Sequence, residues 1–429
     1  MLKFLKNKEM MNAGWIVGEQ IFQMALSFIV SILSARYLGP SNFGLMNYTA
    51  SFISFVSSIV TLGMDGVVIK KMIAREDKEG EYLGSAMGFR LVSSVLCSIS
   101  VILVVYCLNP GDTLVLTLIS VQSIQLIFQA LHILDAWFQR HLKSKYVSLA
   151  KMVACIVVSA YKLFLLMTAK DIRWFAFSNA LNTIVITGIL YLAYNKNDTQ
   201  SLQFSFSTGK EVLGESYHFI LSGLMTAIYG QMSKILLKEM VSSEMVGLFT
   251  TASTLCTMWI FVPTAIINSF RPGIMERKEQ GNEENYLQSL KRLYSMIIWL
   301  CIAVSLAIFL LGGFAINLLY GEEYAGATLP LQILIWSETF SMIGTARGIW
   351  ILAEKKNKYV KYYLGMGAVL NVALNILLIP LCGIAGAAIA TLVTQVFTSL
   401  IAPMFFKETR MHTKIVLQSV DIRYLLGRK

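Results

Sequence analysis

The sequence predicts an all-α, polytopic membrane protein with twelve transmembrane helices. The chain is 56% hydrophobic and only 14% charged, whereas soluble domains carry about 25% charged residues. Its mean hydropathy is +0.63. Apolar stretches long enough to cross a bilayer, roughly 17–25 residues each, recur from one end of the chain to the other. Two short phrases of the first half also return in the second half, in the same order.

The predicted spans are separated by short polar or glycine-containing segments. Each is long enough for a helix through the hydrocarbon core, and each ends where charged or turn-forming residues begin. In chain order the spans are expected near residues 13–37, 43–67, 83–108, 113–138, 146–168, 173–194, 216–240, 245–270, 293–319, 328–353, 360–381 and 384–406.

The two returning phrases indicate an internal duplication. AWFQRHLKSKYV, from residue 136, returns as IWILAEKKNKYV, from residue 349, so Trp137 matches Trp350 and Lys143 matches Lys356. A Gly-Leu pair likewise opens both the second span and the eighth. Because six spans return the chain to its starting side, both lobes point the same way. A pseudo-two-fold axis along the membrane normal is expected to relate them.

The expected organisation is two lobes with a linker and a tail. We place a six-helix lobe at 1–194, a polar cytoplasmic linker at 195–215, a second six-helix lobe at 216–406 and a basic cytoplasmic tail at 407–429. The end of the tail suits an amphipathic helix on the inner leaflet or a disordered segment. Most of the 36 Lys and Arg residues fall in the tails and loops on the N-terminal side, so both termini are expected in the cytoplasm.

Several spans carry polar or small residues three or four positions apart, which places them on one helical face. Such a face suits close helix packing or the wall of a hydrated cavity, and both interpretations stay open for Ser and Thr. Glu19, Gln23 and Lys234 favour the cavity, because a charge at the bilayer centre costs roughly 2.5–3.5 kcal/mol on insertion scales. The polar cavity candidates are Gln23, Asn47, Ser51, Ser54, Gln125, Thr250, Thr254 and Thr257.

Ionisable residues inside the spans are the other candidates, each with a competing interpretation. Lys162, Lys234 and Arg347 lie close enough to span ends for long side chains to reach the interface. Arg90 and Glu338 lie deepest, and for them the alternative is a buried structural ion pair. The four histidines and six cysteines show no metal-binding spacing, so neither a metal nor another cofactor is expected.

The phrase SARYLGPSNFGLMNY (34–48), which joins the first two spans, resembles bacterial polysaccharide flippases of the Wzx type. These belong to the multidrug/oligosaccharidyl-lipid/polysaccharide exporter superfamily. WFQ at 137–139 and GLF at 247–249 are similar to the same family. The resemblance implies a central cavity lined by spans 1, 2, 7 and 8. It also implies alternating access that moves undecaprenyl-diphosphate-linked oligosaccharide repeat units to the outer leaflet of the bacterial cytoplasmic membrane, for O-antigen or capsule synthesis.

The resemblance also suggests roles for the charged residues. The candidate cations for the diphosphate are Arg90, Lys234 and Arg347, with Lys162 a weaker candidate. The candidates for binding a coupling ion, Na⁺ or H⁺, are Glu19, Asp65 and Glu338. No GxxxxGK[ST] phosphate loop is present, so ATP is not the expected energy source. The expected partners are the polyprenyl-diphosphate-linked glycan, the lipid bilayer and other polysaccharide-assembly membrane proteins, and not nucleic acid.

Two other functions remain open. An ion-coupled multidrug antiporter of the same fold would extrude a small organic cation and should favour carboxylates in its cavity, whereas basic candidates equal or outnumber acidic ones here. A membrane glycan polymerase or ligase would need an extended outer loop for catalysis. The predicted outer loops are short, such as LYGEEYAGAT (319–328), so an enzyme is not expected.

Overall fold

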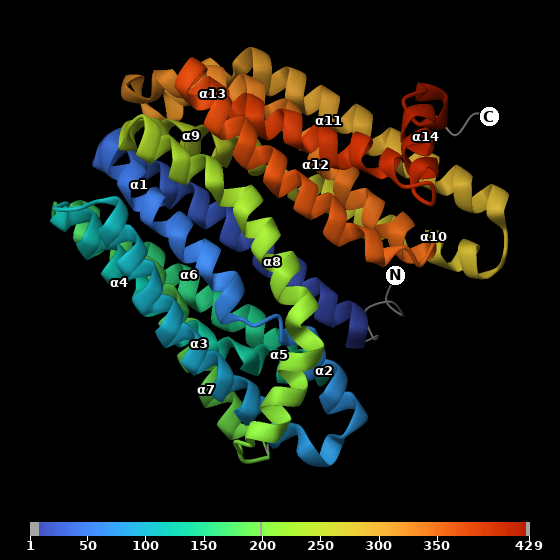
Figure 1. Ribbon diagram of the computed structural model, residues 1–429, viewed down its shortest axis with the longest axis horizontal. Helices are drawn as coiled ribbons and strands as arrows, with labels where there is room; N and C mark the ends of the chain where they lie inside the picture. Colours follow the sequence, from blue (N-terminus) through green and yellow to red (C-terminus); the bar gives the residue numbers. More distant parts are fainter. Residues whose placement is uncertain (1–7, 198–199, 426–429) are drawn as a thin grey trace. The chain divides into compact units, whose positions relative to one another are not determined.

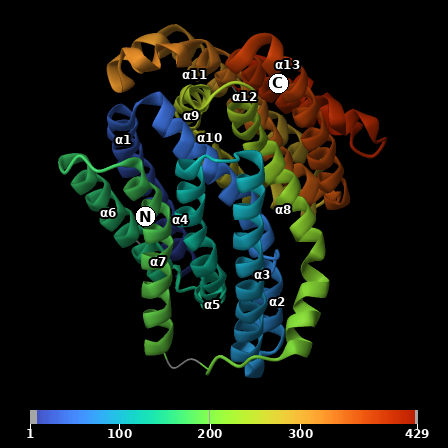
Figure 2. The same cartoon turned by 60° about the vertical axis from the view of Figure 1, so that its left-hand side comes forward.

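The computed structural model describes residues 8–197 and 200–425, and within these ranges the chain forms helices and no strand (Figures 1 and 2). Internal contacts divide the chain into two units, Met1–Ala227 and Ile228–Lys429. The all-α fold class is therefore confirmed. The division falls inside a helix, not in a loop, and the lobe boundaries at 194 and 216 stay predictions.

The first unit contains seven complete α-helices among its described residues. Its connections are short, and polar residues start some helices: the Asp112 carboxylate, for example, accepts the N–H of Val115 at 3.0 Å and so caps a helix. The helices are α1 (Lys8–Val60), α2 (Asp65–Ala74), α3 (Glu79–Leu108), α4 (Thr113–Gln129), α5 (Leu134–Arg140), α6 (Ser144–Met167) and α7 (Ile172–Lys196); α8 (Phe206–Met240) starts here and continues into the second unit.

The second unit begins within α8 and holds six further α-helices. Asn282 caps the longest of them by accepting the N–H of Asn285 at 3.2 Å. These helices are α9 (Ser243–Thr257), α10 (Phe261–Glu279), α11 (Glu283–Tyr320), α12 (Thr328–Ala353), α13 (Val360–Val396) and α14 (Arg410–Gln418); a π-helix, η6 (Phe397–Ile401), and a short 3₁₀ helix, η7 (Ala402–Phe405), follow α13.

Two glycines break long helices at predicted loops between spans. Gly39 interrupts α1 with φ 69° and ψ 167°, and Gly383 interrupts α13 with φ 56° and ψ −131°. Both conformations are open to glycine and strained for residues with a Cβ. Gly39 and Pro40 belong to the RYLGP phrase. That phrase therefore supplies the turn between two helical arms, which Figure 1 draws in dark and lighter blue.

The predicted count of twelve spans is not established. By length and composition, eight helical segments of the described chain qualify as membrane spans, or nine when α9 and α10, bent by 41° at a break, are counted as one. The segment Gly18–Ala74 contains the break at Gly39, and Asn357–Phe405 contains the break at Gly383. Dividing them there, and adding α12, gives the predicted number. Pro263 lies in the first turn of α10, where its missing N–H is tolerated, and the 41° bend falls just before this helix.

The repeated sequence phrase forms the same turn in both units. Leu142 has φ 52° and Lys355 has φ 54°. The next residue is a lysine in each case. The Lys143 N–H donates to the carbonyl of residue 138 at 2.8 Å, and the Lys356 N–H to that of residue 351 at 2.8 Å. The two lysine Nζ atoms lie 4.9 Å and 5.0 Å above the rings of Trp137 and Trp350. A shared cation–π contact on a shared backbone turn supports the duplication.

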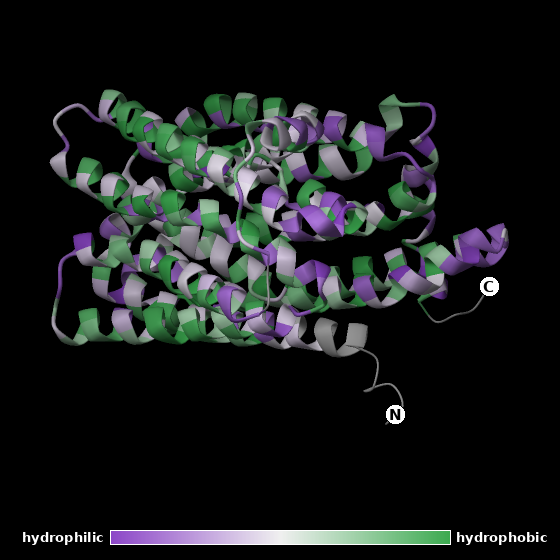
Figure 3. Cartoon of the chain, turned by 90° about the horizontal axis from the view of Figure 1, so that it is seen from below, coloured by the Kyte–Doolittle hydropathy of each residue, from purple (hydrophilic) through white to green (hydrophobic). Residues whose placement is uncertain are grey.

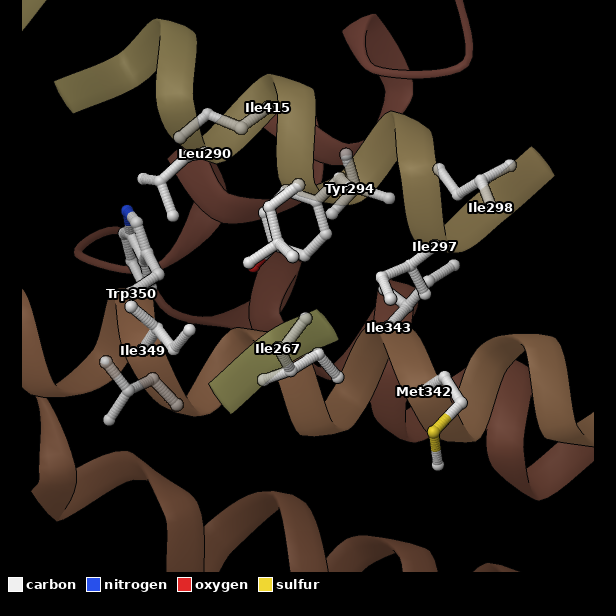
Figure 4. Close-up of a cluster of buried hydrophobic side chains, with 14 of the residues drawn as sticks. Ile267, Leu290, Tyr294, Ile297, Ile298, Met342, Ile343, Ile349, Trp350 and Ile415 are labelled. Carbon is white, nitrogen blue, oxygen red and sulfur yellow. The ribbon is translucent and has the colours of Figure 1, made fainter. Parts of the chain in front are cut away.

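Each unit has its own buried hydrophobic cluster. In the first unit, Met72, Tyr82 and Trp137 belong to a cluster that also includes Val212 of α8. In the second unit, Tyr294 and Trp350 lie together with residues of α10, α11 and α12, as Figure 4 shows. These buried side chains contact one another and not lipid or water. Their packing holds in place the helices whose residues line the cavities described below.

The C-terminal segment packs against the second unit. Ile415 and Val416 of α14 are buried in the cluster of Figure 4. The His412 Nε2 lies 2.9 Å from the Tyr294 hydroxyl. This part of the predicted tail is therefore helical, and Ile415 and Val416 pack against the protein. Met411 and Leu417 of the same helix are exposed, so a contact of α14 with the leaflet stays a prediction. Residues 426–429 lie outside the described residues.

Exposed apolar side chains mark the surface that faces lipid. On α3, Val92, Leu96 and Leu103 are exposed, as are Leu310 and Phe314 on α11. Figure 3 shows hydrophobic residues along most of the helices and hydrophilic residues in the loops at their ends. Such a surface is stable in hydrocarbon, so the protein is a multi-pass membrane protein.

The predicted polar linker is attached to the first unit. Gly80, Gly84 and Gly88 lie one helical turn apart on α3, and an added Cβ on each would collide with residues 201–204. The Gln203 N–H donates to the Gly80 carbonyl at 3.1 Å. The N-terminal part of α8 is held as well, because Lys71 of α2 pairs with Glu211 and Glu215 at 2.5 and 2.6 Å. These contacts place the start of α8 in the first unit.

Candidate functional site

Polar cavities lie inside each unit, and several predicted residues line them. The first, which we call the Lys162 cavity, has a volume of about 250 Å³ in the first unit. Gln23 of α1 and Gln125 of α4, both predicted, contribute to its wall. Lys162 lines it too, so this side chain is in a cavity within the protein. The full polar lining consists of Gln23, Ser27, Gln125, Ser159, Lys162, Asn179, Asn182 and Thr183.

Sequence reasoning missed the contribution of α7 to this cavity. Asn182 and Thr183 lie three and four positions after Asn179, and all three line the wall. The same helical-face analysis that found Asn47, Ser51 and Ser54 would have found them. Each adds an amide or hydroxyl group, and the cavity therefore has polar walls on four different helices.

A second cavity of the first unit, the Glu19 cavity, has a volume of about 320 Å³. Glu19 lies one turn before Gln23 on α1, and Lys151 lies on the facing helix α6. Asp135 of α5 completes a group of two acids and one base in this wall. The predicted ion-binding candidate Glu19 is buried, and the charge of Lys151 acts on both acids. The cavity therefore carries opposite charges, and its acids outnumber its base by one.

Arg90 and Asp65 form an ion pair. The Arg90 Nη2 lies 3.0 Å from the Asp65 Oδ2, and the Arg90 side chain is 1% exposed. Asp65 is the first residue of α2, where its charge also suits the helix N-terminus. The structure thus places a predicted diphosphate-binding cation against a predicted ion-binding acid. The positive charge of Arg90 is already balanced within the protein.

We expect Asp65→Asn to destabilise the protein by about 1–2 kcal/mol, because it leaves the buried Arg90 guanidinium unpaired. Fully buried pairs lose roughly 3–5 kcal/mol, and the 57% exposure of the Asp65 side chain reduces this cost. The measurement is the melting temperature of the purified protein. Asp77→Asn, at an exposed acid of the same unit, is the control. Equal melting temperatures for the two variants would show that the ion pair contributes nothing.

Most hydroxyl and amide side chains on the predicted polar helical faces donate hydrogen bonds to the backbone of their own helix. The Ser51 Oγ donates to the Asn47 carbonyl at 2.8 Å, and the Thr254 Oγ1 to the Thr250 carbonyl at 2.8 Å. The Thr257 hydroxyl donates to its helix at 3.0 Å. Each hydroxyl hydrogen is therefore donated within its own helix. The lone pairs of the oxygen remain available to accept a hydrogen bond from a ligand. Their assignment to substrate binding stays a prediction.

The other predicted residues of these helical faces differ in their hydrogen bonding and burial. The Asn47 amide donates to the Phe43 carbonyl at 2.8 Å. Ser54 is exposed. Thr250 is buried, and its hydroxyl has no hydrogen-bond partner within the described part of the chain.

Arg347 lies in a cavity of the second unit, which we call the Arg347 cavity. This cavity has a volume of about 260 Å³. The Arg347 Nη1 donates to the Thr398 carbonyl at 2.5 Å, and its guanidinium lies 4.7 Å from the ring centre of Tyr363. Its Nε has no hydrogen-bond partner among the described residues. The other polar groups of the wall come from Tyr229, Ser341, Thr345, Tyr363, Gln395, Thr398 and Ser399.

A local irregularity presents this carbonyl to Arg347. Thr398 lies in the π-helix η6 (Phe397–Ile401), and π-helical turns disturb the regular ladder of backbone hydrogen bonds. A carbonyl there is available to a side chain from another helix. The sequence carries no pattern that announces such a turn. The cation–π contact and the carbonyl together orient Arg347 without an acid partner.

Lys234 of α8 and Glu338 of α12 are partly buried and take part in no ion pair with another described residue. Glu338 lies in electrostatic range of Tyr229, Cys256 and Cys301. Unpaired charges inside membrane helices usually face water or a ligand. Both remain candidates for the roles predicted from the sequence.

A family model described as polysaccharide biosynthesis protein matches residues 10–272. The chain belongs to this family. The match covers more than half of the sequence and confirms the relationship that the RYLGP phrase predicts. Membership in the polysaccharide biosynthesis protein family also agrees with the all-helical membrane fold.

Two curated relatives of this family member come from Haloferax volcanii. The probable flippase AglR is 24% identical over 401 residues, which are 90% of this chain and 80% of the relative. The probable low-salt glycan biosynthesis flippase Agl15 is 22% identical over 410 residues, 94% of this chain and 82% of the relative. Both alignments run through nearly the whole chain.

Two solved structures share the fold. The lipid II flippase MurJ in its inward closed conformation gives a TM-score of 0.76 at 15% identity, over 95% of this chain and 91% of that one. An inward-facing multidrug resistance MATE family transporter gives 0.69 at 14% identity, over 92% and 96%. At these identities the likeness concerns the fold alone, and it confirms a transporter-type architecture.

Proposed function

We propose that this protein is a flippase that moves lipid-linked glycan repeat units from the inner to the outer leaflet of the bacterial cytoplasmic membrane. The proposed carrier is undecaprenyl diphosphate, the products are surface polysaccharides such as O-antigen or capsule, and the movement is by alternating access. The observation that carries this proposal is the family match over residues 10–272, supported by relatives named as flippases across most of the chain.

The chemistry of such a substrate suits the charges inside the helices. A polyprenyl tail can stay in hydrocarbon, whereas a diphosphate and sugars are expensive to desolvate. Arg347 offers a buried cation with an unpartnered Nε in a polar cavity, and Lys234 offers an amine outside any ion pair of the described residues. We assign the diphosphate to these two cations. Arg90 is less suited, because Asp65 balances its charge.

A coupling ion, Na⁺ or H⁺, belongs to the same proposal. Glu338 is the strongest of the three acid candidates, because no basic side chain pairs with it among the described residues. Glu19 shares its cavity with Lys151, and Asp65 is held by Arg90. The distribution of Lys and Arg supports a cytoplasmic location for both termini in this proposal.

The multidrug antiporter remains the main alternative, since a MATE transporter shares the fold. Two of the three cavities described above contain a basic group with no acid in the lining, at Lys162 and at Arg347. A lone cation repels a cationic drug and attracts an anion. A polymerase or ligase is less well supported, because the relatives are named as flippases.

The experiment compares cells with and without the gene. We expect the deletion strain to accumulate a lipid-linked oligosaccharide on the inner leaflet, where an impermeant glycosidase or lectin reaches it in inside-out vesicles but not in intact cells. Reintroducing the gene should clear it. The proposal fails if no such oligosaccharide accumulates. Sensitivity to cationic dyes that rises on deletion and returns to normal on complementation would instead support the antiporter.

A further inference from the structure

We propose that the Lys162 cavity is a binding site for an acidic sugar residue, that is, one monosaccharide bearing a carboxylate. In this assignment the Lys162 ammonium pairs with the carboxylate, and the surrounding amides bind the ring hydroxyls. The inference rests on the proposed glycan flippase function and narrows its substrate class.

Four helices build the polar wall, and each supplies a different part. Gln23 comes from α1, Gln125 from α4, Lys162 from α6, and Asn179 and Asn182 from α7. No hydrogen bond within the described residues engages the side-chain amides of these four Gln and Asn residues. An amide that is removed from water without a partner is costly. A ligand rich in hydroxyls, or ordered water in its absence, supplies the partners.

The charge of the cavity favours one negative group over several. Lys162 is the one charged residue among those that line it, and no carboxylate of the described chain lies within ion-pair distance of its amine. A single ammonium balances a single carboxylate. A diphosphate carries more negative charge than one lysine balances, and the rest of this wall is neutral. The chemistry therefore points to an acidic sugar and away from the carrier diphosphate.

The size of the cavity also agrees with one sugar ring. At roughly 30 Å³ per water molecule, a volume of about 250 Å³ holds on the order of eight waters. This is the space that one monosaccharide displaces. Donors and acceptors are both present, because amides offer both, and sugar hydroxyls require both.

The neighbouring Glu19 cavity provides an internal contrast on the same two helices. Lys151 lies three turns before Lys162 on α6, and it shares its cavity with Glu19 and Asp135. Its charge is therefore offset by protein acids, and an anionic sugar would meet two carboxylates there. Of these two cavity-lining lysines of α6, Lys162 alone is suited to an anion. Lys151 is thus the matched control for Lys162.

The test measures binding of glucuronate and glucose to the purified full-length protein by saturation-transfer NMR. We expect glucuronate to bind the wild type at least about tenfold more tightly than glucose, since a hydrogen bond between charged groups contributes roughly 1.5–3 kcal/mol. Lys162→Met should abolish this preference. Lys162→Arg and Lys151→Met should retain it, and all variants should elute as a single species.

The site assignment is overturned if the wild type does not distinguish the two sugars, or if Lys162→Met still prefers glucuronate. Transport is measured separately, in proteoliposomes with polyprenyl-diphosphate-linked disaccharides that carry a uronic acid or the neutral sugar. Loss of the glucuronate preference in Lys162→Met, with no transport of either lipid by the wild type, would sustain the site and refute the flippase function. Transport of both lipids without a binding preference would do the reverse.

Discussion

Replacing Arg347 with Met is expected to reduce the appearance of the glycan on the cell surface by about tenfold or more. The guanidinium is buried, has no acid partner in its cavity, and keeps its Nε free of hydrogen bonds among the described residues. If it binds the diphosphate, its removal costs roughly 1.5–3 kcal/mol per charged hydrogen bond, and each 1.4 kcal/mol is a factor of ten. The measurement is surface glycan per unit of membrane-inserted protein.

Two further variants separate binding from folding. Arg347→Lys keeps the charge but loses the planar contact with Tyr363, so we expect it to retain part of the activity. Arg423→Met removes an arginine of the same unit that is paired with Asp421 on the surface, and it should transport normally. Arg347→Met with wild-type transport and an unchanged melting temperature would remove Arg347 from the proposed mechanism.

The spans and the duplication were predictable because they rest on local patterns. Hydrophobic length fixes a membrane helix without knowledge of its neighbours, and RYLGP contains the glycine and proline at the first helix break. The repeated Trp137 and Trp350 phrases were visible for the same reason, since they specify a turn through nearby residues. The helix breaks at Gly39 and Gly383 fall between predicted spans for the same reason, since glycine is the residue that adopts these backbone angles without strain.

Pairing between distant residues was not predictable from these patterns. Arg90 and Asp65 were assigned different functional roles, whereas the structure places them 3.0 Å apart. An ionisable residue in a span has the same local sequence whether it meets a partner, a cavity or the interface. Lys162 illustrates the opposite case. Its position near the end of a span suggested that it reaches the interface, but α1, α4 and α7 enclose it in a cavity.

The linker shows that the polar composition of a segment does not predict how it packs. Residues 195–215 are polar and were predicted as a connecting segment. Gly80, Gly84 and Gly88, which contact the linker, lie in a different part of the sequence. They are spaced one helical turn apart, so this face of α3 has no side chains at these positions. Such a face suits either a second helix or an extended segment. Only the structure shows that residues 200–205 occupy it.

The break in α13 leads to the largest expected effect on stability. We expect Gly386→Val to lower the stability of the protein by about 3 kcal/mol, at the upper end of the range for overpacking. After Gly383 the chain reverses, so a side chain at position 386 would collide with the carbonyl of Leu378 and with the N–H of Ile379. Both are backbone groups of the preceding arm, and moving them would separate the two arms. The measurement is the fraction of protein that stays monodisperse after heating.

A matched glycine shows whether the collision is responsible. Gly348 lies on α12, and an added Cβ there meets nothing within 4 Å. Gly348→Ala should therefore be neutral or slightly stabilising, because alanine favours the helix by about 1 kcal/mol over glycine. Gly386→Ala should already destabilise, since even a methyl group reaches the Leu378 carbonyl, and Gly386→Val should exceed it. If both Gly386 variants survive heating as well as Gly348→Ala does, the two arms of α13 do not pack as closely as described, and the hairpin at Gly383 is wrong.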